Sequence, residues 1–420
     1  MKTDLVLSNA DELVCVSLSG KPLFGKECQD IDVLRHHSIA VHRDMIIAIG
    51  PAEEIASEFD PISEIDCSGK VITPGLVDAH THPIFVHTRE DEFEQRLLGK
   101  SYVEISQSGG GILSTIRTTR HASEEELFKL AYKRLEKMLF QGTTTIEAKS
   151  GYGLTTESEL KQLKVIGELA DKMPLDVVPT FLGAHEFPEE YKDKHDAYIR
   201  ILCEEMLPAV AEQGIAKFCD IFTEAHTYNL TESRKILSKA KELNLKLKIH
   251  ADELEPIGGA ELAAEMGCTS ADHLARTSVK GIHALKNAGV VPVLLPATVF
   301  SLGSTNYAPA REMMATGLPV ALATDFNPGS CNCDSLPLVM ALACLQMKMT
   351  PAEVLAACTI NAAAAIDLEQ KVGSITVGKQ ADLLIWDIPS YKYLPYHLGS
   401  SFPQTVIKSG RIVDFPLPKP

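Results

Sequence analysis

The sequence predicts an α/β fold, a (β/α)8 barrel of the TIM type joined to a small β-sandwich domain that both chain ends form. Short strand-like runs alternate with longer helical patterns between about residues 70 and 370, which is typical of a parallel sheet. Eight such units follow one another, which favours a closed barrel, although an open doubly wound sheet shares most of the pattern. The flanks lack this alternation. We therefore expect a barrel domain over residues 70–371 and a small domain over residues 1–69 and 372–420.

Each predicted barrel strand is a short, mainly apolar run, and several of these runs finish in His or Asp. The eight segments are residues 76–82, 143–150, 176–185, 216–225, 245–252, 269–274, 290–297 and 319–327. Because all the strands of such a barrel point the same way, the carboxyl ends of these runs are expected at one face.

The segments between these runs have the spacing of amphipathic helices. In residues 124–140, apolar side chains recur three and four positions apart and share one face. These side chains are Leu127, Leu130, Ala131, Leu135, Met138 and Leu139. Two start signals, Ser123 with Glu126 and Thr156 with Glu159, fit the capping box, in which a hydroxyl and a carboxylate satisfy free amides at a helix N-terminus.

The flanks contain short β-like pieces, such as SIAVHRDMIIAIG and KVITPG on one side and ADLLIWD and TVIKSGRIVDF on the other. Gly and Pro separate these pieces, and helical periodicity is weak. We expect the two ends to pair into one β domain beside the barrel.

Composition limits the class of protein. The chain has 420 residues, which exceeds the usual size of a single core, so an accessory domain is expected. Its 40 basic and 56 acidic side chains give a net charge of −16, which argues against nucleic acid or an anionic membrane as a partner. An anionic substrate would need a local cationic anchor.

The ten cysteines are scattered without a C-x-x-C pair, and the only close spacing is Cys331 with Cys333. This pattern supports neither a disulfide framework nor a zinc ribbon, and it indicates reduced thiols. The N-terminal stretch lacks the pattern of a signal peptide, and no apolar run reaches about 18 residues. We expect a soluble cytoplasmic protein.

The run LVDAHTHP at residues 76–83 places two imidazoles, His80 and His82, two residues apart at the end of a strand. Side chains at positions i and i+2 leave a strand on the same face, with Cα atoms about 7 Å apart, so both rings can reach one ion. The alternative reading is that polar residues simply end a strand where a loop begins. That reading poorly explains the other strand ends, which carry His185, His250, His273 and Asp325.

The donor set of His80, His82, His250 and Asp325 suits one zinc or ferrous ion with a position left open for water. Such an ion lowers the pKa of bound water toward about 7, which favours a hydrolase. Glu253 follows His250 by three residues and is a candidate proton shuttle; otherwise it is a solvated loop carboxylate. His273 is a candidate for polarising the oxyanion; otherwise it is a hydrogen-bonded residue at a strand end.

The motifs HTHP, HADE, SADH, ATDFNPGS and GSITVGKQADLLIWD together resemble the amidohydrolase superfamily. Within it, five longer segments resemble the imidazolonepropionases of histidine catabolism. These segments are REDEF at 89–93, EAKSGYGL at 147–154, FLGAHEFP at 181–188, HADELEPIGGAELAAEMG at 250–267 and LLPATVFSLGSTNYAPAREM at 294–313. The resemblance runs from the first barrel strand almost to the C-terminus.

This resemblance implies hydrolysis of 4-imidazolone-5-propanoate to N-formimidoyl-L-glutamate by a homodimer with one zinc or iron ion per chain. It implies that the metal ligands are His80, His82, His250 and Asp325. On chemical grounds, the candidate catalytic residues are Glu253, His273 and Asp325. The implied substrate contacts are Arg89, Tyr152, His185, Glu253, Asn327, Gly329 and Ser330. Physical reasoning agrees on Arg89, because a propionate entering an acidic protein needs a guanidinium for bidentate capture. The alternative for Arg89 is an ordinary salt bridge with Glu90 or Asp91.

Two departures and two rival functions remain open at this stage. The chain has His87 where the family usually has a small residue, so the mouth of the site is expected to differ. Two-metal relatives carry a modified lysine at the end of the fourth barrel strand, but here that strand ends FTEA. This difference favours one metal and makes Lys149, after the second strand, a structural residue or one that supports the metal ligands. A cyclic-base deaminase would use nearly the same ligands but has no evident use for Arg89. A non-catalytic scaffold would not need to keep all four ligands.

Overall fold

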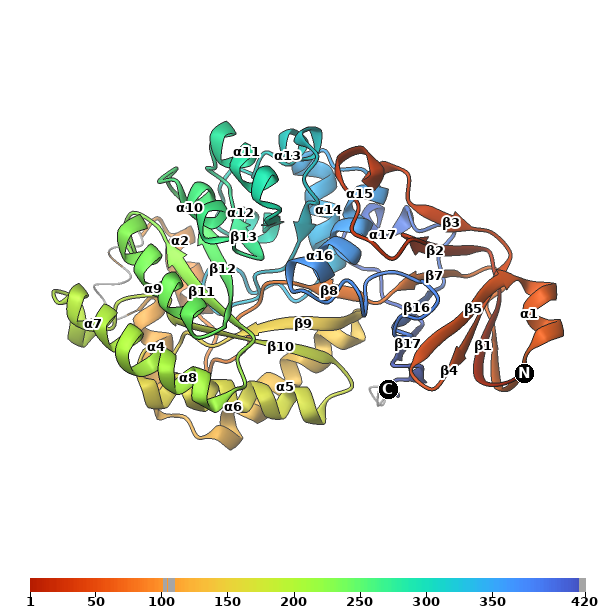
Figure 1. Cartoon of the computed structure of the whole chain (residues 1–420), viewed down its shortest axis with the longest axis horizontal. Coiled ribbons are helices and arrows are strands. Elements are labelled where there is room, and N and C mark those ends of the chain that lie inside the picture. The colour runs from red at the N-terminus through yellow and green to blue at the C-terminus, as the bar shows by residue number, and fades with distance from the viewer. Residues whose placement is uncertain (101–103, 105–109, 415–420) are drawn as a thin grey trace.

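The computed structural model describes residues 1–100, 104 and 110–414 (Figure 1). Its largest sheet has eight parallel strands in sequence order, and each strand lies within one of the eight predicted segments. The strands are β8 (Leu76–Asp78), β9 (Thr143–Lys149), β10 (Asp176–Ala184), β11 (Phe218–Thr223), β12 (Lys246–Ala251), β13 (Ser270–His273), β14 (Val291–Leu294) and β15 (Ala321–Leu322). The prediction of eight parallel strands is confirmed.

The barrel closes just beyond the first and last strands. Thr81, after β8, forms a parallel bridge with Phe326, after β15. The His82 amide donates to the Phe326 carbonyl at 2.8 Å, and the Asp325 amide donates to the His80 carbonyl at 3.0 Å. These bonds join the two ends of the sheet, so the fold is the predicted closed barrel and not the open doubly wound alternative. The closure also brings two predicted metal ligands into contact along the backbone.

Helices cover the outside of the barrel (Figure 1). They include α2 (Glu90–Leu97), α4 (Ile112–His121), α5 (Glu124–Phe140), α6 (Thr156–Lys172), α7 (His195–Ile201), α8 (Leu207–Gln213), α9 (Leu230–Glu242), α10 (Gly259–Met266), α11 (Val279–Ala288), α12 (Pro296–Ser301), α13 (Ala310–Thr316), α14 (Leu336–Met347), α15 (Pro351–Ala357) and α16 (Ile360–Ala365). Five of the six apolar residues predicted for the inner face of α5 are buried, and Leu130 is half-buried. At its start, Ser123 accepts the expected hydrogen bond from the Glu126 amide.

The predicted start of α6 is wrong by one residue. Thr155, whose backbone is extended, caps the helix by accepting a hydrogen bond from the Ser158 amide at 3.3 Å, and Thr156 is already helical. The Glu159 carboxylate is buried and accepts three backbone amides of residues 151–154 at 2.8–3.0 Å. Glu159 therefore does not complete a capping box but holds the loop that carries Tyr152.

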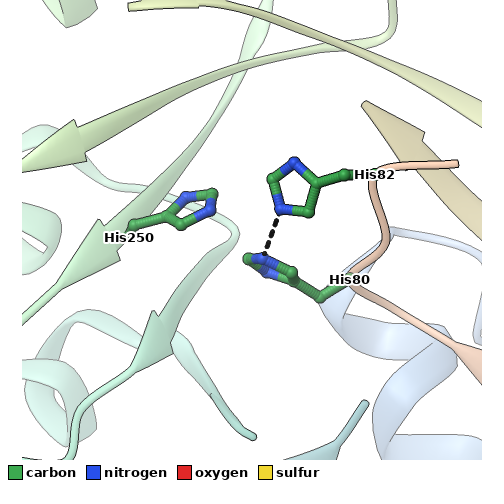
Figure 2. Close-up of side chains that lie close together, drawn as sticks. All are labelled: His80, His82 and His250. Carbon is green, nitrogen blue, oxygen red and sulfur yellow. Dashed lines mark hydrogen bonds between the residues drawn. The ribbon is translucent and has the colours of Figure 1, made fainter. Parts of the chain in front are cut away.

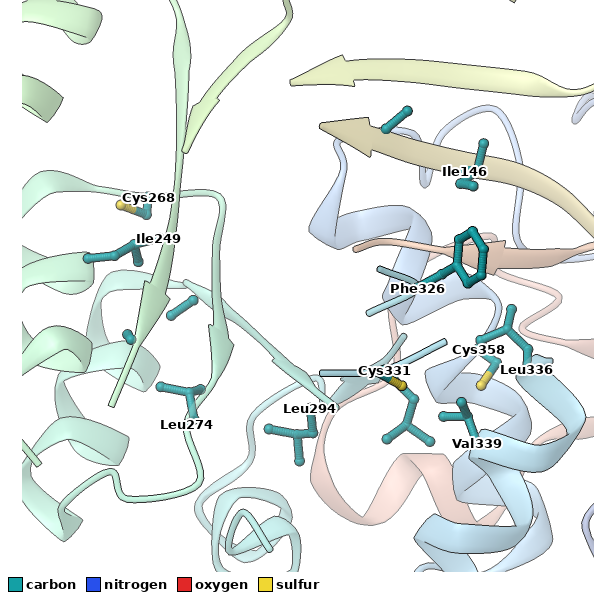
Figure 3. Packing of buried hydrophobic residues seen from close by; sticks show 14 of the residues in the cluster. Ile146, Ile249, Cys268, Leu274, Leu294, Phe326, Cys331, Leu336, Val339 and Cys358 are labelled. Atoms are coloured by element: carbon teal, nitrogen blue, oxygen red, sulfur yellow. The ribbon is translucent and has the colours of Figure 1, made fainter. Parts of the chain in front are cut away.

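The interior and exterior of the barrel wall are set by the two-residue period of the strands. In β12, Ile249 belongs to the apolar cluster between strands and helices (Figure 3). The neighbouring Lys248 and His250 make polar contacts inside the barrel. Leu336 and Val339 of α14 belong to the same cluster. Burying each such aliphatic side chain contributes about 1.5–3 kcal/mol, which fixes the strands whose ends carry the site.

The small domain consists of two sheets, and both chain ends contribute strands to it, as predicted. One sheet contains β1 (Lys2–Ala10), β4 (His37–His42), β5 (Met45–Pro51) and β6 (Asp60–Asp66). The other contains β2 (Glu12–Val16), β3 (Asp32–Leu34), β7 (Val71–Pro74), β16 (Leu383–Trp386), β17 (Thr405–Lys408) and β18 (Arg411–Ile412). Because β7 pairs with β2 and with β16, it joins the two chain ends directly before the chain enters the barrel. The exact domain boundaries stay a prediction, and residues 415–420 lie outside the described residues.

Candidate metal centre and active site

Three histidine rings and one carboxylate face a common point at the carboxyl ends of the barrel strands. His80 and His82 follow β8, His250 lies in β12, and Asp325 follows β15. Figure 2 shows the three imidazoles turned toward one another from opposite sides of the barrel. The Nε2 atoms of His80 and His82 are 3.2 Å apart, and Asp325 Oδ1 lies 3.6 Å and 3.5 Å from them, respectively. His250 offers a nitrogen within 4.8 Å of both histidines.

This geometry fits a divalent cation. A tetrahedral ion with bonds of about 2.0–2.2 Å separates its ligand atoms by roughly 3.3–3.6 Å. Three of the ligand separations, 3.2, 3.5 and 3.6 Å, are close to that range. In addition, His82 Nδ1 and both ring nitrogens of His250 are buried without a hydrogen-bond partner. Buried polar atoms are rarely left unpaired, so the unpaired Nε2 of His250 fits the role of a metal ligand.

Buried carboxylates lie behind the histidines and orient them. His80 Nδ1 is 2.6 Å from Asp272 Oδ2, and His250 Nδ1 is 3.1 Å from Asp220 Oδ2, although the second pair is poorly aligned for a hydrogen bond. Burial, with a smaller effect of the Lys149 charge, lowers the pKa of His80 well below its usual value. His80 is therefore neutral and donates through Nδ1, which leaves the lone pair of Nε2 directed at the metal point. Carboxylates hydrogen-bonded to metal-binding histidines have this role in many metalloproteins.

Lys149 connects these carboxylates from below. Its ammonium lies 2.6 Å from Glu147 Oε1 and 2.7 Å from Asp220 Oδ2, and all three side chains are fully buried. Burial alone would lower the pKa of Lys149, but the carboxylates of Asp220, Glu147 and Asp272 raise it above its usual value. Lys149 is thus a permanent cation that neutralises the acidic groups behind the histidines.

Replacing Lys149 with Met is expected to lower the free energy of unfolding by about 3–5 kcal/mol, because two buried carboxylates lose their counter-charge. Urea denaturation followed by circular dichroism measures this change. The matched control is Lys172→Met, which removes an exposed pair with Glu168 on α6 and is expected to leave stability close to wild type. Equal stability of the two variants would contradict the role given to Lys149.

Glu253 and His273 lie beside the metal point. Glu253 follows β12 in the loop, and its Oε2 lies 3.5 Å from Nδ1 of His273, at the end of β13. Burial, with the negative charges of Asp325 and Glu224, raises the pKa of Glu253 to about 8. Burial lowers the pKa of His273 to about 3, so its ring is neutral at pH 7. His273 also forms a second possible ligand group with His80 and Asp325.

The second oxygen of Asp325 is held by a neighbouring hydroxyl. Thr298, in the first turn of α12, donates a hydrogen bond to Asp325 Oδ2 at 2.7 Å. Only Oδ1 of Asp325 therefore remains directed at the two histidines of the HTH run. The Asp325 carboxylate is therefore arranged to bind a cation through Oδ1 alone.

His185 and Tyr152 form an aromatic wall against the histidine cluster. The His185 ring stacks on His82 with centroids 5.1 Å apart, and the Tyr152 ring lies 5.3 Å from His185. His185 Nδ1 lies 3.0 Å from the carbonyl oxygen of Gly151 and donates to it, so its Nε2 is free to accept. Both predicted substrate contacts are thus brought to the site.

The segment Asn327–Gly329–Ser330 forms a tight loop directly after Asp325. The Asn327 side-chain oxygen accepts the amides of Gly329 and Ser330, both at 2.8 Å, and its nitrogen donates to the Asp325 carbonyl at 2.7 Å. Arg89 lies over Gly329 so closely that a Cβ atom there would be 1.7 Å from the guanidinium. Gly329 is required for Arg89 to occupy this position, whereas the Asn327 amide mainly shapes the loop.

Two cavities are bordered by different residues of α12. A cavity of about 150 Å³ is bordered by Glu253, His273 and Thr298. A cavity of about 400 Å³ is bordered by Arg89, Ala297 and Gly329, among others. Acid–base groups therefore border the cavity on one side of α12, and a cation borders the cavity on the other. The predicted departure, His87, is exposed in the loop before Arg89.

Sequence comparison matches residues 71–413 to the Amidohydrolase family. The chain belongs to the amidohydrolase family. A relative named imidazolonepropionase from Alkaliphilus oremlandii is 48% identical over 417 residues, which cover 98% of each chain. Another relative of that name, from Geobacillus thermodenitrificans, is 49% identical over 414 residues, which cover 97% of each chain.

Two solved structures with the same fold are much more distant in sequence than these relatives. A zinc-containing adenosine deaminase from Xanthomonas campestris superposes with a TM-score of 0.69 at 18% identity, covering 98% of this chain and 93% of the deaminase. A triazine hydrolase variant gives a TM-score of 0.71 at 14% identity, covering 97% and 94% of the two chains. These similarities support the barrel architecture of this amidohydrolase and say nothing of its substrate.

Several residues of the amidohydrolase site are absent from the sequence-based prediction. Asp220 and Asp272 orient histidines, Thr298 orients Asp325, and Glu224 accepts the Leu254 amide at 2.8 Å in the loop of the proton shuttle. A signal for the first two exists, because each is a carboxylate inside a predicted buried strand. Thr298 and Glu224 act through contacts between distant segments, which a single sequence does not show.

Proposed function

We infer that this amidohydrolase is an imidazolonepropionase, which hydrolyses the ring amide of 4-imidazolone-5-propanoate to give N-formimidoyl-L-glutamate. The observation that carries this conclusion is the similarity over nearly the whole chain to several relatives of that name. The barrel, the cluster of metal-binding side chains and a cationic residue beside that cluster are consistent with an anionic cyclic amide as substrate.

We propose that His80, His82, His250 and Asp325 hold one zinc or iron ion per chain. Such an ion supplies a low pKa for a bound water and positive charge beside a carbonyl oxygen. The neutral state of His80 and His82 supports this assignment, because burial keeps the pKa of both rings well below the usual value and only neutral imidazole binds a metal.

The acid–base steps are assigned to the chain's own groups. A water molecule attacks the ring carbonyl carbon and transfers a proton to Glu253 or Asp325. The carbon–nitrogen bond then breaks, and Glu253 delivers a proton to the departing ring nitrogen. A carboxyl whose pKa is near 8 can both accept and release a proton at neutral pH, which suits this role. The neutral His273 donates a hydrogen bond to the developing oxyanion, where a fixed dipole stabilises the transition state.

Substrate binding is assigned to the groups around the metal point. Arg89 receives the propionate, and Tyr152 and His185 contact the ring from the aromatic wall. The loop of Asn327, Gly329 and Ser330 closes the remaining side. Among described residues, none of the helices is long and apolar enough to span a bilayer. A homodimer, a cytoplasmic location and the absence of a nucleic-acid partner stay predictions.

Purified protein is expected to consume 4-imidazolone-5-propanoate, measured as loss of its ultraviolet absorbance, and a chelator is expected to abolish the reaction. Adding back zinc or ferrous iron should restore it, and metal analysis should find about one ion per chain. Cytosine and guanine serve as control substrates. Release of ammonia from either ring, without turnover of the imidazolone, would favour the deaminase. Absence of metal and of turnover would favour a scaffold.

A further inference from the structure

A second arginine shares the cavity that Arg89 borders. Arg96 lies two turns along α2 from Arg89, and both guanidinium groups line the cavity of about 400 Å³ together with Gly329. The nearest polar contact of Arg96 is the Gly329 carbonyl, 3.5 Å from its terminal nitrogen, at the limit of a hydrogen bond. Within residues 1–100, 104 and 110–414, no carboxylate forms an ion pair with Arg96. Its charge is therefore available to a ligand.

Arg89, unlike Arg96, already forms an ion pair with a carboxylate of the described residues. Its Nε lies 3.3 Å from Glu92 Oε2, so the charge of the predicted anchor is already partly balanced. Glu90 also borders the cavity, so the charges of Arg89 and Arg96 balance those of Glu90 and Glu92. Without Arg96 the count would be −1, and an anionic substrate would meet a negative site in a protein of net charge −16.

The two guanidinium groups are also close enough to repel each other. Burial and the charge of Arg89 lower the pKa of Arg96 below its usual value. The charge of Glu92 offsets part of this repulsion, and a bound carboxylate would offset more of it. Helix α2 has no fully buried residue, so Arg96 is not placed there by core packing.

The cavity that Arg89 and Arg96 border is placed to receive the propionate end of the substrate. The cavity lies on the opposite side of α12 from Glu253 and His273, which border the smaller cavity. A ring bound at the metal point, with its scissile nitrogen toward Glu253, would extend its propionate away from Glu253 and toward the two arginines.

We propose that Arg96 and Arg89 together form a two-guanidinium carboxylate site that binds the propionate of the substrate, with Arg96 as a specificity-determining residue. This inference rests on the proposed function and on the role of Arg89. Arg96 supplies a positive charge that no carboxylate of the described residues pairs with, and Arg89, held over Gly329, supplies the fixed orientation. Charge-assisted hydrogen bonds from two guanidinium groups to one carboxylate are stronger than neutral ones and discriminate against uncharged analogues.

Steady-state kinetics of Arg96→Met tests the proposal. We expect the KM of this variant for 4-imidazolone-5-propanoate to be about 10- to 100-fold higher than that of wild type, with little change in kcat. An increase of this size corresponds to the loss of one charge-assisted hydrogen bond. Arg96→Lys should recover part of that loss, because it restores the charge without the fork geometry. The matched control is Arg200→Met, which makes the same change in net charge at an exposed position of α7 and should leave KM unchanged.

A second substrate separates binding from a structural effect. In the propanamide analogue, a primary amide replaces the carboxylate, and wild type should show a much lower kcat/KM on it. Arg96→Met should then lose little further kcat/KM on the amide. An unchanged KM in Arg96→Met, or an equal loss on both substrates, would overturn the carboxylate site. Failure of the wild type to hydrolyse either compound would instead overturn the proposed function.

Discussion

Replacing Glu253 with Gln is expected to lower kcat by about 10²- to 10⁴-fold while the protein keeps its metal. The substitution preserves the size of the side chain and its position beside His273, but it removes the group that accepts and returns a proton. Glu253 is not among the candidate ligand groups, so metal content measured by elemental analysis should match wild type. Stopped-flow or steady-state ultraviolet assays measure the change in kcat.

The control for this variant is Glu255→Gln, two positions further along the same loop. The Glu255 side chain is exposed, and only its backbone amide is anchored, by Glu224 at 3.2 Å. We expect its kcat to equal that of wild type. Turnover near wild type in Glu253→Gln would remove Glu253 from the mechanism and leave Asp325 as the only assigned base.

The arrangement of the site could be anticipated from sequence because barrel topology turns order along the chain into proximity. His80, His250 and Asp325 are far apart in sequence, but each follows or ends a strand whose carboxyl end lies at the same face. The eight apolar runs and the helical spacing between them were sufficient to predict that face. No knowledge of side-chain contacts was needed.

The sequence pattern did not predict the backbone conformation at the strand ends. The last predicted strand, 319–327, forms a regular strand at Ala321–Leu322 and an isolated bridge at Phe326. Asp325 leaves the sheet with φ of 54°, and His273 and Asp252 also have positive φ, which non-glycine residues rarely adopt. Tertiary contacts to these residues, such as that of Thr298 to Asp325, offset the strain.

The helix start at α6 shows a related limit. Thr155 and Thr156 are adjacent hydroxyl residues, and either one satisfies the pattern of a helix cap. The choice is made by Glu159, whose carboxylate binds backbone amides in the loop of Tyr152 instead of the cap amide. Arg96 had no signal of its own, because a single charged residue on a surface helix is usually only solvated.

Replacing His250 with Ala is expected to reduce metal content well below one ion per chain and kcat/KM by on the order of 10³-fold or more. The substitution removes the one ligand contributed from the far side of the barrel, and several kcal/mol of electrostatic stabilisation are lost with the ion. The control is His283→Ala, at an exposed position on α11, which should retain both metal and activity. Elemental analysis of the dialysed proteins gives the metal content.

The same variant decides between two ways of holding the ion. His80 belongs to two overlapping groups, one with His82 and His250 and the other with His273 and Asp325. If His250→Ala keeps one tightly bound ion, the ion is held by the second group, and His273 is a ligand and not a hydrogen-bond donor to the oxyanion. If metal is lost, the first group holds it with Asp325, and His273 stays free to face the substrate.

The His250→Ala substitution also removes the imidazole that lies 3.1 Å from the Asp220 carboxylate. We expect His250→Ala to fold stably even when it loses the metal, because the Lys149 ammonium still neutralises the Asp220 carboxylate.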